Sequence, residues 1–153
     1  MMIRVSSIVY KMEGKEPDPE NHYLRTPLKS ANLVAGHGIE DDRKGGNPKR
    51  NLNIMSFETL EALREEGFST LPGQMGEQIV IQGLDVGEMA VGDRLQIGDI
   101  ALVEVISHRT GCQRFERIQG KSQKQAAGRM GIMAKVVTGG RISVGDSVKN
   151  SGN

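Results

Sequence analysis

The 153-residue sequence offers few groups for covalent cross-links or multi-ligand metal sites. It contains one cysteine, Cys112, so it cannot form an internal disulfide or a zinc site of the multi-cysteine type. It has no tryptophan, and aromatic residues make up only 3% of the chain, so we expect a mainly aliphatic core. A chain of this length can bury such a core without a metal or disulfide staple.

Neither sign of charge is in excess, and long apolar runs are missing. The 20 Lys and Arg residues balance 19 Asp and Glu residues, which argues against broad binding to nucleic acid or to a membrane surface. No apolar stretch approaches the ~20 residues of a membrane span, and the first residues lack the apolar segment of a signal peptide. We therefore expect a cytoplasmic protein with a single domain over residues 1–153.

Short strands and tight turns dominate the pattern along the chain. Runs rich in β-branched and aliphatic residues predict strands over 3–12, 31–35, 51–55, 78–81, 94–97, 100–106, 131–138 and 147–149. Phe57, Leu60 and Leu63 recur at helical spacing between an N-cap at Ser56 and a glycine at 67. Residues 113–119 form a second, shorter helical stretch. The fold class is therefore mainly β, and we expect a closed or nearly closed antiparallel β-barrel.

A long loop over residues 36–50 is rich in glycine and charge, and loops of this length are often functional. Its glycines would let backbone amides approach an anion, but plain turn geometry explains them equally well. For the adjacent Asp41 and Asp42 we expect a solvated pair. Neither of the common glycine-rich nucleotide-binding patterns occurs in the chain, so nucleotide binding is not indicated.

Cys112 lies between a strand-like run and a short helical stretch. The cations Arg109, Arg114 and Arg117, with His108 when it is protonated, favour the thiolate. A thiolate attacks sulfur, carries a persulfide or binds a soft metal. The alternative is that Cys112 is a small buried hydrophobic residue, which is the common role of a lone cysteine.

Several pieces of the sequence together form a recognisable pattern: residues 36–43, 53–56, 72–78, 83–85, 91–98, Cys112, 131–142 and 145–146. In this order they resemble the MOSC domain, the C-terminal module of molybdenum cofactor sulfurases, in its stand-alone bacterial form. Each is weak alone, but their order and spacing together are specific. The resemblance implies a β-barrel with a few peripheral helices, and it places Cys112 at the characteristic cysteine of the family.

The resemblance also implies molybdenum cofactor as the ligand. Cys112 would be the sulfur donor or the metal ligand. Side chains that would hold the cofactor or its phosphate are Arg43, Lys44, Lys49, Arg50, Arg109 and Arg114, with Glu77 and His37 as further pocket candidates. For each cation the alternative is a solvated loop charge. Glu77 is equally well explained as a turn-stabilising carboxylate, and His37 as a structural or solvent-facing residue.

Three positions depart from the family pattern. Gly111 stands where the family often has proline, which frees the backbone before the thiol. Gln78 stands where the family usually has asparagine, and it is longer by one methylene. Lys44 stands where histidine is common, which weakens any histidine-based role for the loop.

Three functions fit this pattern. The first is sulfur transfer, in which Cys112 takes a persulfide sulfur from a donor such as a cysteine desulfurase and passes it toward a molybdoenzyme. The second is a small molybdoenzyme that reduces N-hydroxylated compounds with Cys112 as the molybdenum ligand. The third is a cofactor-binding module without chemistry. No pattern marks a Schiff-base lysine, so pyridoxal phosphate is not expected as a cofactor.

Overall fold

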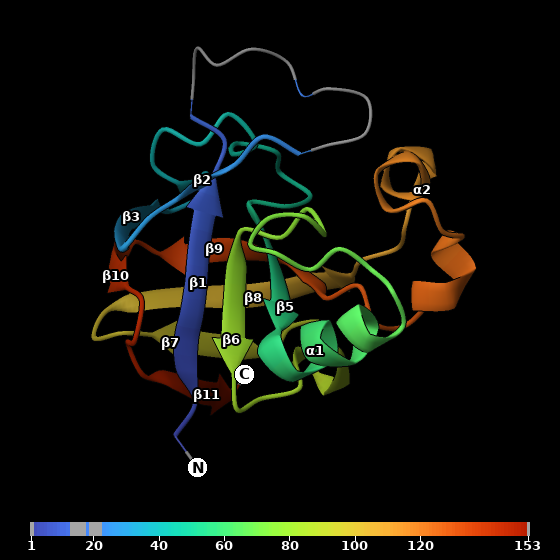
Figure 1. Ribbon diagram of the computed structural model, residues 1–153. Coiled ribbons are helices and arrows are strands. Elements are labelled where there is room, and N and C mark those ends of the chain that lie inside the picture. The colour runs from blue at the N-terminus through green and yellow to red at the C-terminus, as the bar shows by residue number, and fades with distance from the viewer. Residues whose placement is uncertain (1, 13–17, 19–22, 153) are drawn as a thin grey trace.

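The computed structural model describes residues 2–12, 18 and 23–152, and it is mainly β (Figure 1). The strands are β1 (Arg4–Tyr10), β2 (Thr26–Pro27), β3 (Ser30–Val34), β4 (Gly38–Ile39), β5 (Leu52–Ser56), β6 (Ile79–Gln82), β7 (Arg94–Ile97), β8 (Ala101–His108), β9 (Ile132–Thr138), β10 (Gly140–Ser143) and β11 (Val148–Gly152). The α-helices are α1 (Phe57–Glu65) and α2 (Gln113–Gln119), and the 3-10 helices are η1 (Val86–Glu88) and η2 (Gln123–Ala126).

One large sheet curls into a nearly closed barrel. It has eight strands in the order β11-β7-β8-β9-β5-β6-β1-β2, and a three-stranded sheet, β10-β3-β4, lies beside it. Val5 of β1 donates its N–H to Asp146 and accepts one from Gly145, just before β11. These bonds bring the β11 edge back toward β1. The expected barrel with peripheral helices is confirmed.

The expectation of a purely antiparallel barrel is wrong at one pair. Strands β5 and β6 run parallel, with Ile54 opposite Ile79 and Ser56 opposite Ile81. Helix α1 connects them, because a parallel pair needs a crossover rather than a hairpin. Ser56 precedes this helix as expected, but its hydroxyl does not cap it: Oγ donates to the Leu84 carbonyl and accepts the N–H of Val86.

Two groups of buried side chains hold the fold together. The barrel interior is aliphatic, and β8 shows the alternation that fills it, with Ala101, Val103 and Val105 buried between more exposed neighbours. The second group packs the helices on the outside of the barrel: Met55, Leu60, Leu63, Phe68, Met75, Val80, Phe115, Ala126 and Met130. Strand β5 is buried along its whole length because it contributes to both groups.

Helix α2 is anchored beside the barrel by one aromatic contact. Phe115 is fully buried and stacks on Phe68, with ring centroids 6.1 Å apart. The helix therefore has a fixed position at the end of β8, although most of its surface faces outward (Figure 1). Neither α-helix among the described residues has the length and apolar character of a membrane-crossing segment.

Candidate functional site

A cavity of about 320 Å³ opens at the end of β8, beside Cys112. Its wall is formed by Tyr23, Arg25, Lys44, Arg50, Gly76, Gln78, Arg109, Thr110, Gly111, Cys112, Arg114 and Met133. Five of these residues are cationic, and none is an aspartate or glutamate. The chain as a whole is nearly neutral, so this cavity is a local concentration of positive charge.

Cys112 lies at the junction that the sequence predicts. It precedes α2 in an extended conformation, with φ −145° and ψ 174°, and it is an exposed free thiol. The alternative of a small buried hydrophobic residue is therefore wrong. Arg109 is near enough to interact electrostatically with Cys112.

Gly111, the residue before the thiol, is closely packed. A Cβ at this position would lie 2.6 Å from the Cβ of Gln123 and 3.1 Å from the sulfur of Met130. A larger residue here would push η2 away from the thiol segment. The glycine thus allows η2 to pack against the thiol segment, rather than simply loosening the backbone.

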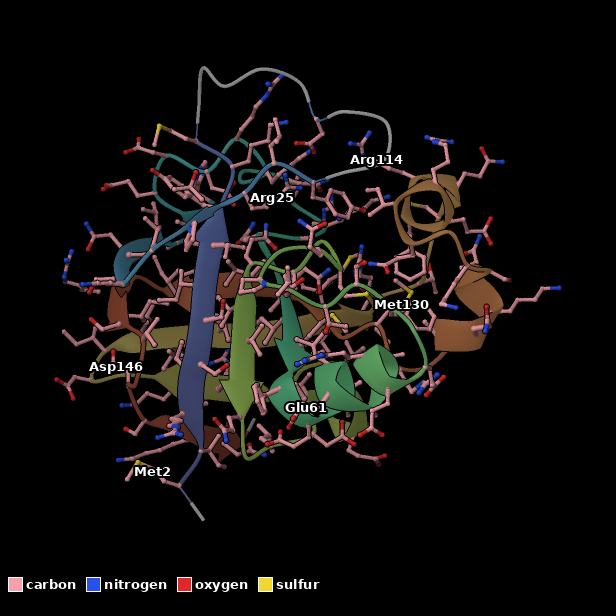
Figure 2. All side chains as sticks on the ribbon, in the orientation of Figure 1. Met2, Arg25, Glu61, Arg114, Met130 and Asp146 are labelled. Carbon is pink, nitrogen blue, oxygen red and sulfur yellow. The ribbon has the colours of Figure 1, made fainter. Side chains whose placement is uncertain are left out.

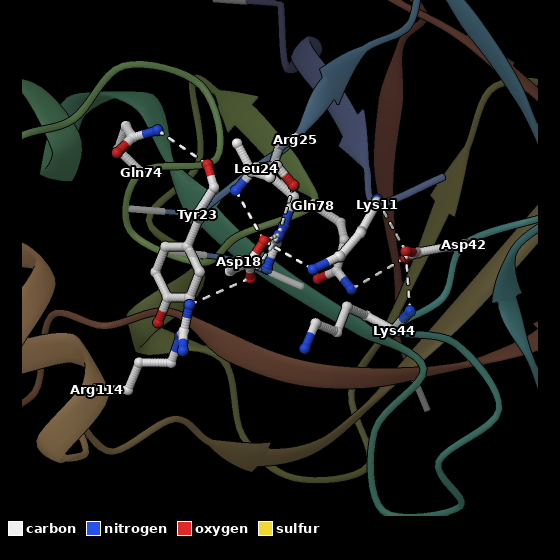
Figure 3. A network of polar contacts seen from close by, with 10 residues as sticks. All are labelled: Lys11, Asp18, Tyr23, Leu24, Arg25, Asp42, Lys44, Gln74, Gln78 and Arg114. Carbon is white, nitrogen blue, oxygen red and sulfur yellow. Dashed lines mark hydrogen bonds and ion pairs between the residues drawn. The ribbon is translucent and has the colours of Figure 1, made fainter. Parts of the chain in front are cut away.

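A network of hydrogen bonds and ion pairs around Asp18 connects several cations in or beside the cavity wall (Figure 3). Asp18 accepts the Lys11 ammonium at 2.8 Å, Arg25 Nη1 at 3.2 Å and the N–H of Leu24 at 2.9 Å. Arg114 Nη2 lies 3.5 Å from the same carboxylate. One buried anion therefore connects cations from the residue after β1, from the segment before β2 and from α2.

The ring of Tyr23 adds a second link between two of these cations. The Arg25 guanidinium lies 4.9 Å from its centroid and that of Arg114 lies 5.5 Å away. In Figure 2 the Arg25 and Arg114 side chains lie at the same end of the barrel, opposite Met2. Because Arg114 is two residues after Cys112, these contacts also hold the start of α2 in place.

The charge state of Asp18 follows from these neighbours. Burial acts to raise the pKa of Asp18, but the Lys11 hydrogen bond, the Leu24 N–H and the charge of Arg25 outweigh it and lower the pKa from 3.8 to about 2. Asp18 is therefore ionised at neutral pH.

Arg109 is a buried cation of the cavity wall. It is 8% exposed and donates from Nη1 to the carbonyl of Met75. Burial lowers the pKa of its guanidinium, opposed by the charges of Tyr23, Cys112 and Glu77. The hydrogen bond of Arg109 connects the segment before Cys112 to the turn before β6. The bond also fixes the position of the guanidinium charge in the cavity wall.

Two further predictions concern the turn before β6. Glu77 does not line the cavity: it is buried, and its carboxylate accepts the N–H groups of Gly73 at 2.8 Å and of Met75 at 3.1 Å. The structure thus shows Glu77 as a turn-stabilising carboxylate that stands outside the wall of the Cys112 cavity. Gln78 does line the cavity, but its amide accepts from Asn53 N–H and donates to Asp42.

The loop residues divide into two groups. Lys44 and Arg50 line the cavity, whereas Arg43, Lys49 and His37 do not. Arg43 lies on the exposed surface and donates its N–H to Lys11, and the His37 ring packs over Gly45. Sequence spacing could not separate these residues, because the turns of the loop direct successive side chains to opposite sides.

Asp42 differs most from its expectation. It is 1% exposed and accepts the N–H groups of Lys11 and Lys44, together with the Gln78 amide. The solvated pair with Asp41 is thus wrong, since only Asp41 is exposed. Asp42 instead attaches the loop that contains Lys44 to Lys11, the residue after β1.

Sequence reasoning missed Tyr23, Arg25 and Asp18. They precede β2, in a segment without a motif, and no local signal in the sequence marks them as neighbours of Cys112. The structure brings them there because β2 pairs with the end of β1, with Tyr10 opposite Thr26.

The cavity wall contains one thiol, that of Cys112, and one thioether, that of Met133. No group of three or more His, Cys, Asp or Glu side chains able to hold a metal ion occurs in the described part of the chain. A larger cavity of about 420 Å³ lies beside α1, but it lacks a thiol, and its carboxylates Glu58 and Asp85 accept the backbone N–H groups of Gly83 and Gly87. The cavity at Cys112 is therefore the candidate functional site.

Replacement of Glu77 by glutamine tests how strongly this carboxylate stabilises the turn before β6. The neutral amide has only one oxygen to accept two buried N–H groups, so one is left unpaired, and we expect a loss of about 2 kcal/mol in the free energy of unfolding. Urea unfolding measures it. Glu58→Gln is the control, because Glu58 also accepts a backbone N–H but at an exposed position. Equal losses in both variants would contradict a special role for the buried turn.

Fold and site together define a β-barrel domain with one exposed thiol at a cation-lined cavity. The sequence matches the family model described as MOSC domain over residues 41–149, so the chain belongs to the MOSC domain family. Its domain is of the molybdenum cofactor sulfurase type. No curated protein matches the chain at a significant level.

Solved structures show the same fold. The YUAD protein from Bacillus subtilis superposes with a TM-score of 0.73 at 20% identity, covering 96% of this chain and 94% of that one. YiiM from Escherichia coli gives 0.69 at 22% identity, covering 98% and 70%. YiiM from Geobacillus stearothermophilus gives 0.66 at 19% identity, covering 96% and 72%. At these identities the likeness concerns the fold alone.

Proposed function

We propose that this protein binds molybdenum cofactor in the cavity at Cys112 and that Cys112 carries sulfur as a persulfide. The observation that carries the proposal is the exposed thiol at a cavity whose wall, among the described residues, has five cations and no carboxylate. The MOSC family is associated with this cofactor, and the match covers most of the chain. In the cell the donor would be a cysteine desulfurase and the recipient a molybdoenzyme.

The residues present fit the chemical groups of the cofactor. Its phosphate suits Arg25, Lys44 and Arg50, because guanidinium and ammonium groups bind phosphate oxygens with charge-assisted hydrogen bonds. Its soft, thiophilic metal suits the sulfur of Cys112. When bound, the cofactor would supply the metal centre that accepts sulfur.

The sulfur-transfer step needs only the thiol of this chain and a donor persulfide. The Cys112 thiolate attacks the outer sulfur of the donor, a new S–S bond forms, and the S–S bond of the donor breaks. The electron pair of the broken bond leaves on the donor thiolate, which takes up a proton. Since the chain has no second cysteine, no internal thiol can resolve the product into a disulfide.

The cations have a second role in this step. A persulfide anion on Cys112 lies beside fixed positive charges, and Arg109 is already near enough to interact with Cys112. Because Arg109 is buried and bonded to Met75, its charge does not need to move when the anion forms. The cavity would thus stabilise the loaded form before delivery.

Mass spectrometry of the protein after incubation with a cysteine desulfurase and cysteine tests the proposal. We expect an adduct of about 32 Da, one sulfur atom, on wild type and on Arg50→Gln, and none on Cys112→Ser. After expression in a host that makes the cofactor, we expect pterin and molybdenum with wild type and less with Arg50→Gln. Lys49→Gln is the matched control, since Lys49 comes from the same loop but does not line the cavity.

Two other outcomes would replace this function. Molybdenum that is lost in Cys112→Ser, without any persulfide on wild type, would favour a molybdenum enzyme in which Cys112 is the ligand and N-hydroxylated compounds are the substrates. Cofactor that is retained equally by Cys112→Ser and wild type, again without persulfide, would favour a binding module with an inert thiol. If neither cofactor nor persulfide is found on the wild-type protein, all three functions are overturned.

A further inference from the structure

Lys44 differs in its partners from most of the cations near the cavity; only Arg50 resembles it, since among the described residues its side chain also has no hydrogen bond or ion pair. Lys11, Arg25 and Arg114 share the carboxylate of Asp18, and Arg109 donates to the Met75 carbonyl. Within the described residues, no hydrogen bond or ion pair reaches the ammonium of Lys44. Its backbone N–H is fixed by Asp42 at 3.0 Å, so the residue is anchored while its amine is free to react.

The charges around Lys44 are mostly of its own sign. Partial burial lowers the pKa of its amine below the ordinary 10.5, and the charges of Arg25, Lys11 and Arg50 lower it further, against the opposing effect of Asp18. Figure 3 shows the Lys44 side chain extending from the Asp42 side of the network toward Arg114. A lysine beside other cations has more of its amine in the neutral, nucleophilic form.

The same cations that activate the amine attract anions. Arg25, Arg50, Arg109 and Arg114 line the cavity with Lys44, and no carboxylate of the described part of the chain lines it. A reagent that carries a phosphate would therefore be concentrated and oriented beside the amine. A reagent without an anionic group would not be concentrated or oriented by these cations.

We propose that Lys44 is a covalent attachment site for phosphorylated carbonyl compounds, in which the arginines of the cavity hold the phosphate and the Lys44 amine attacks the carbonyl carbon. A C–N bond forms, and the carbonyl oxygen becomes the hydroxyl of a carbinolamine. Loss of water then gives the imine, so the step needs no oxidant or reductant. The inference does not depend on molybdenum cofactor, because it uses only the amine and the anion-binding wall.

This site was not expected from the sequence, where no pattern marks a Schiff-base lysine. Only the tertiary structure places Lys11 and Arg25 near Lys44, since Lys11 follows β1 and Arg25 precedes β2. Pyridoxal 5′-phosphate is used below as a probe of the compound class, not as a cofactor.

The test is limited labelling of the full chain with pyridoxal 5′-phosphate, reduction with borohydride and peptide mapping. We expect Lys44 to be labelled about tenfold or more faster than Lys49, a lysine of the same loop outside the cavity, because the cations concentrate the anionic reagent. Inorganic phosphate should slow labelling of Lys44 but not of Lys49. Pyridoxal, which lacks the phosphate, should show no such preference.

Variants add a second readout. Lys44→Arg keeps the charge and removes the nucleophile, so the fast-labelled peptide should disappear, while Lys49→Arg should leave it. The proposal is overturned if wild-type Lys44 reacts no faster than Lys49, or if phosphate does not protect it. Both comparisons use the wild-type protein alone. They are independent of the persulfide test, which measures an adduct on Cys112.

Discussion

Replacing Asp18 by asparagine is expected to destabilise the protein by about 3 kcal/mol. The side chains of Lys11 and Arg25 are only 4% and 6% exposed, and both use Asp18 as their counter-ion. Removing the charge leaves two buried cations without compensation, which costs more than loss of the attraction alone. Urea unfolding at neutral pH measures the change.

Glu104→Gln is the matched control for this variant. Glu104 also pairs with two cations, Arg94 and Lys135, but at the surface, where solvent screens the charges. We therefore expect a much smaller loss of stability than in Asp18→Asn. Similar losses in both variants would mean that burial of the Asp18 network has no energetic weight.

The pH dependence of stability gives the same prediction a second readout. The pKa of Asp18 is about 2 in the folded protein and 3.8 without its partners, so its contribution is complete above pH 3.8 and is lost as the pH falls toward 2. Asp18→Asn lacks this group and should show a flatter decline over the same interval. A decline as steep as that of wild type would contradict the assignment.

Replacing Gly131 by alanine is expected to cost about 3 kcal/mol or more. Gly131 has φ +88°, and a Cβ there would collide with the carbonyl oxygen of Ile54 and lie 2.7 Å from Met55 Cγ. The backbone of β5 and the start of β9 approach closely at this point, and Gly131 also accepts the N–H of Arg109. Thermal or urea unfolding measures the loss.

Gly92→Ala separates the two contributions to this cost. Gly92 has φ +93°, nearly the same backbone conformation, but no atom within 4 Å of the added Cβ. This variant should lose only the ~1 kcal/mol of backbone strain. If the two alanine variants are equally destabilised, the close approach of β5 and β9 does not matter.

Secondary structure was largely readable from local pattern. Residues 94–97 and 113–119 form β7 and α2 at the expected bounds, and the other expected strands shift by no more than a few residues. β10 was missed, because it begins at the second glycine of a pair that resembles a turn, and the two-residue strands β2 and β4 were missed as well. The parallel β5–β6 pair was also missed, since strand direction depends on where α1 packs.

The candidate site was predictable only in part. Cys112, Arg109, Arg114, Lys44 and Arg50 were named from the sequence, and all five line the cavity. His37, Arg43 and Glu77 were named too but lie outside it. The difference is one of side-chain direction, which the turns of the loop and the buried N–H groups around Glu77 decide.

The sequence by itself determined where the strands and helices form and where the thiol lies among them, because periodicity and turn residues act over a few neighbouring positions. Only the tertiary structure decided which charges face that thiol. Asp18, Tyr23 and Arg25 are about ninety residues from Cys112 and reach it because β1, β2 and the loop before β5 meet at one end of the barrel. The closed fold also sets the protonation of Asp18, because the hydrogen bonds and charges of Lys11 and Arg25 outweigh the effect of burial and lower the pKa of its carboxyl.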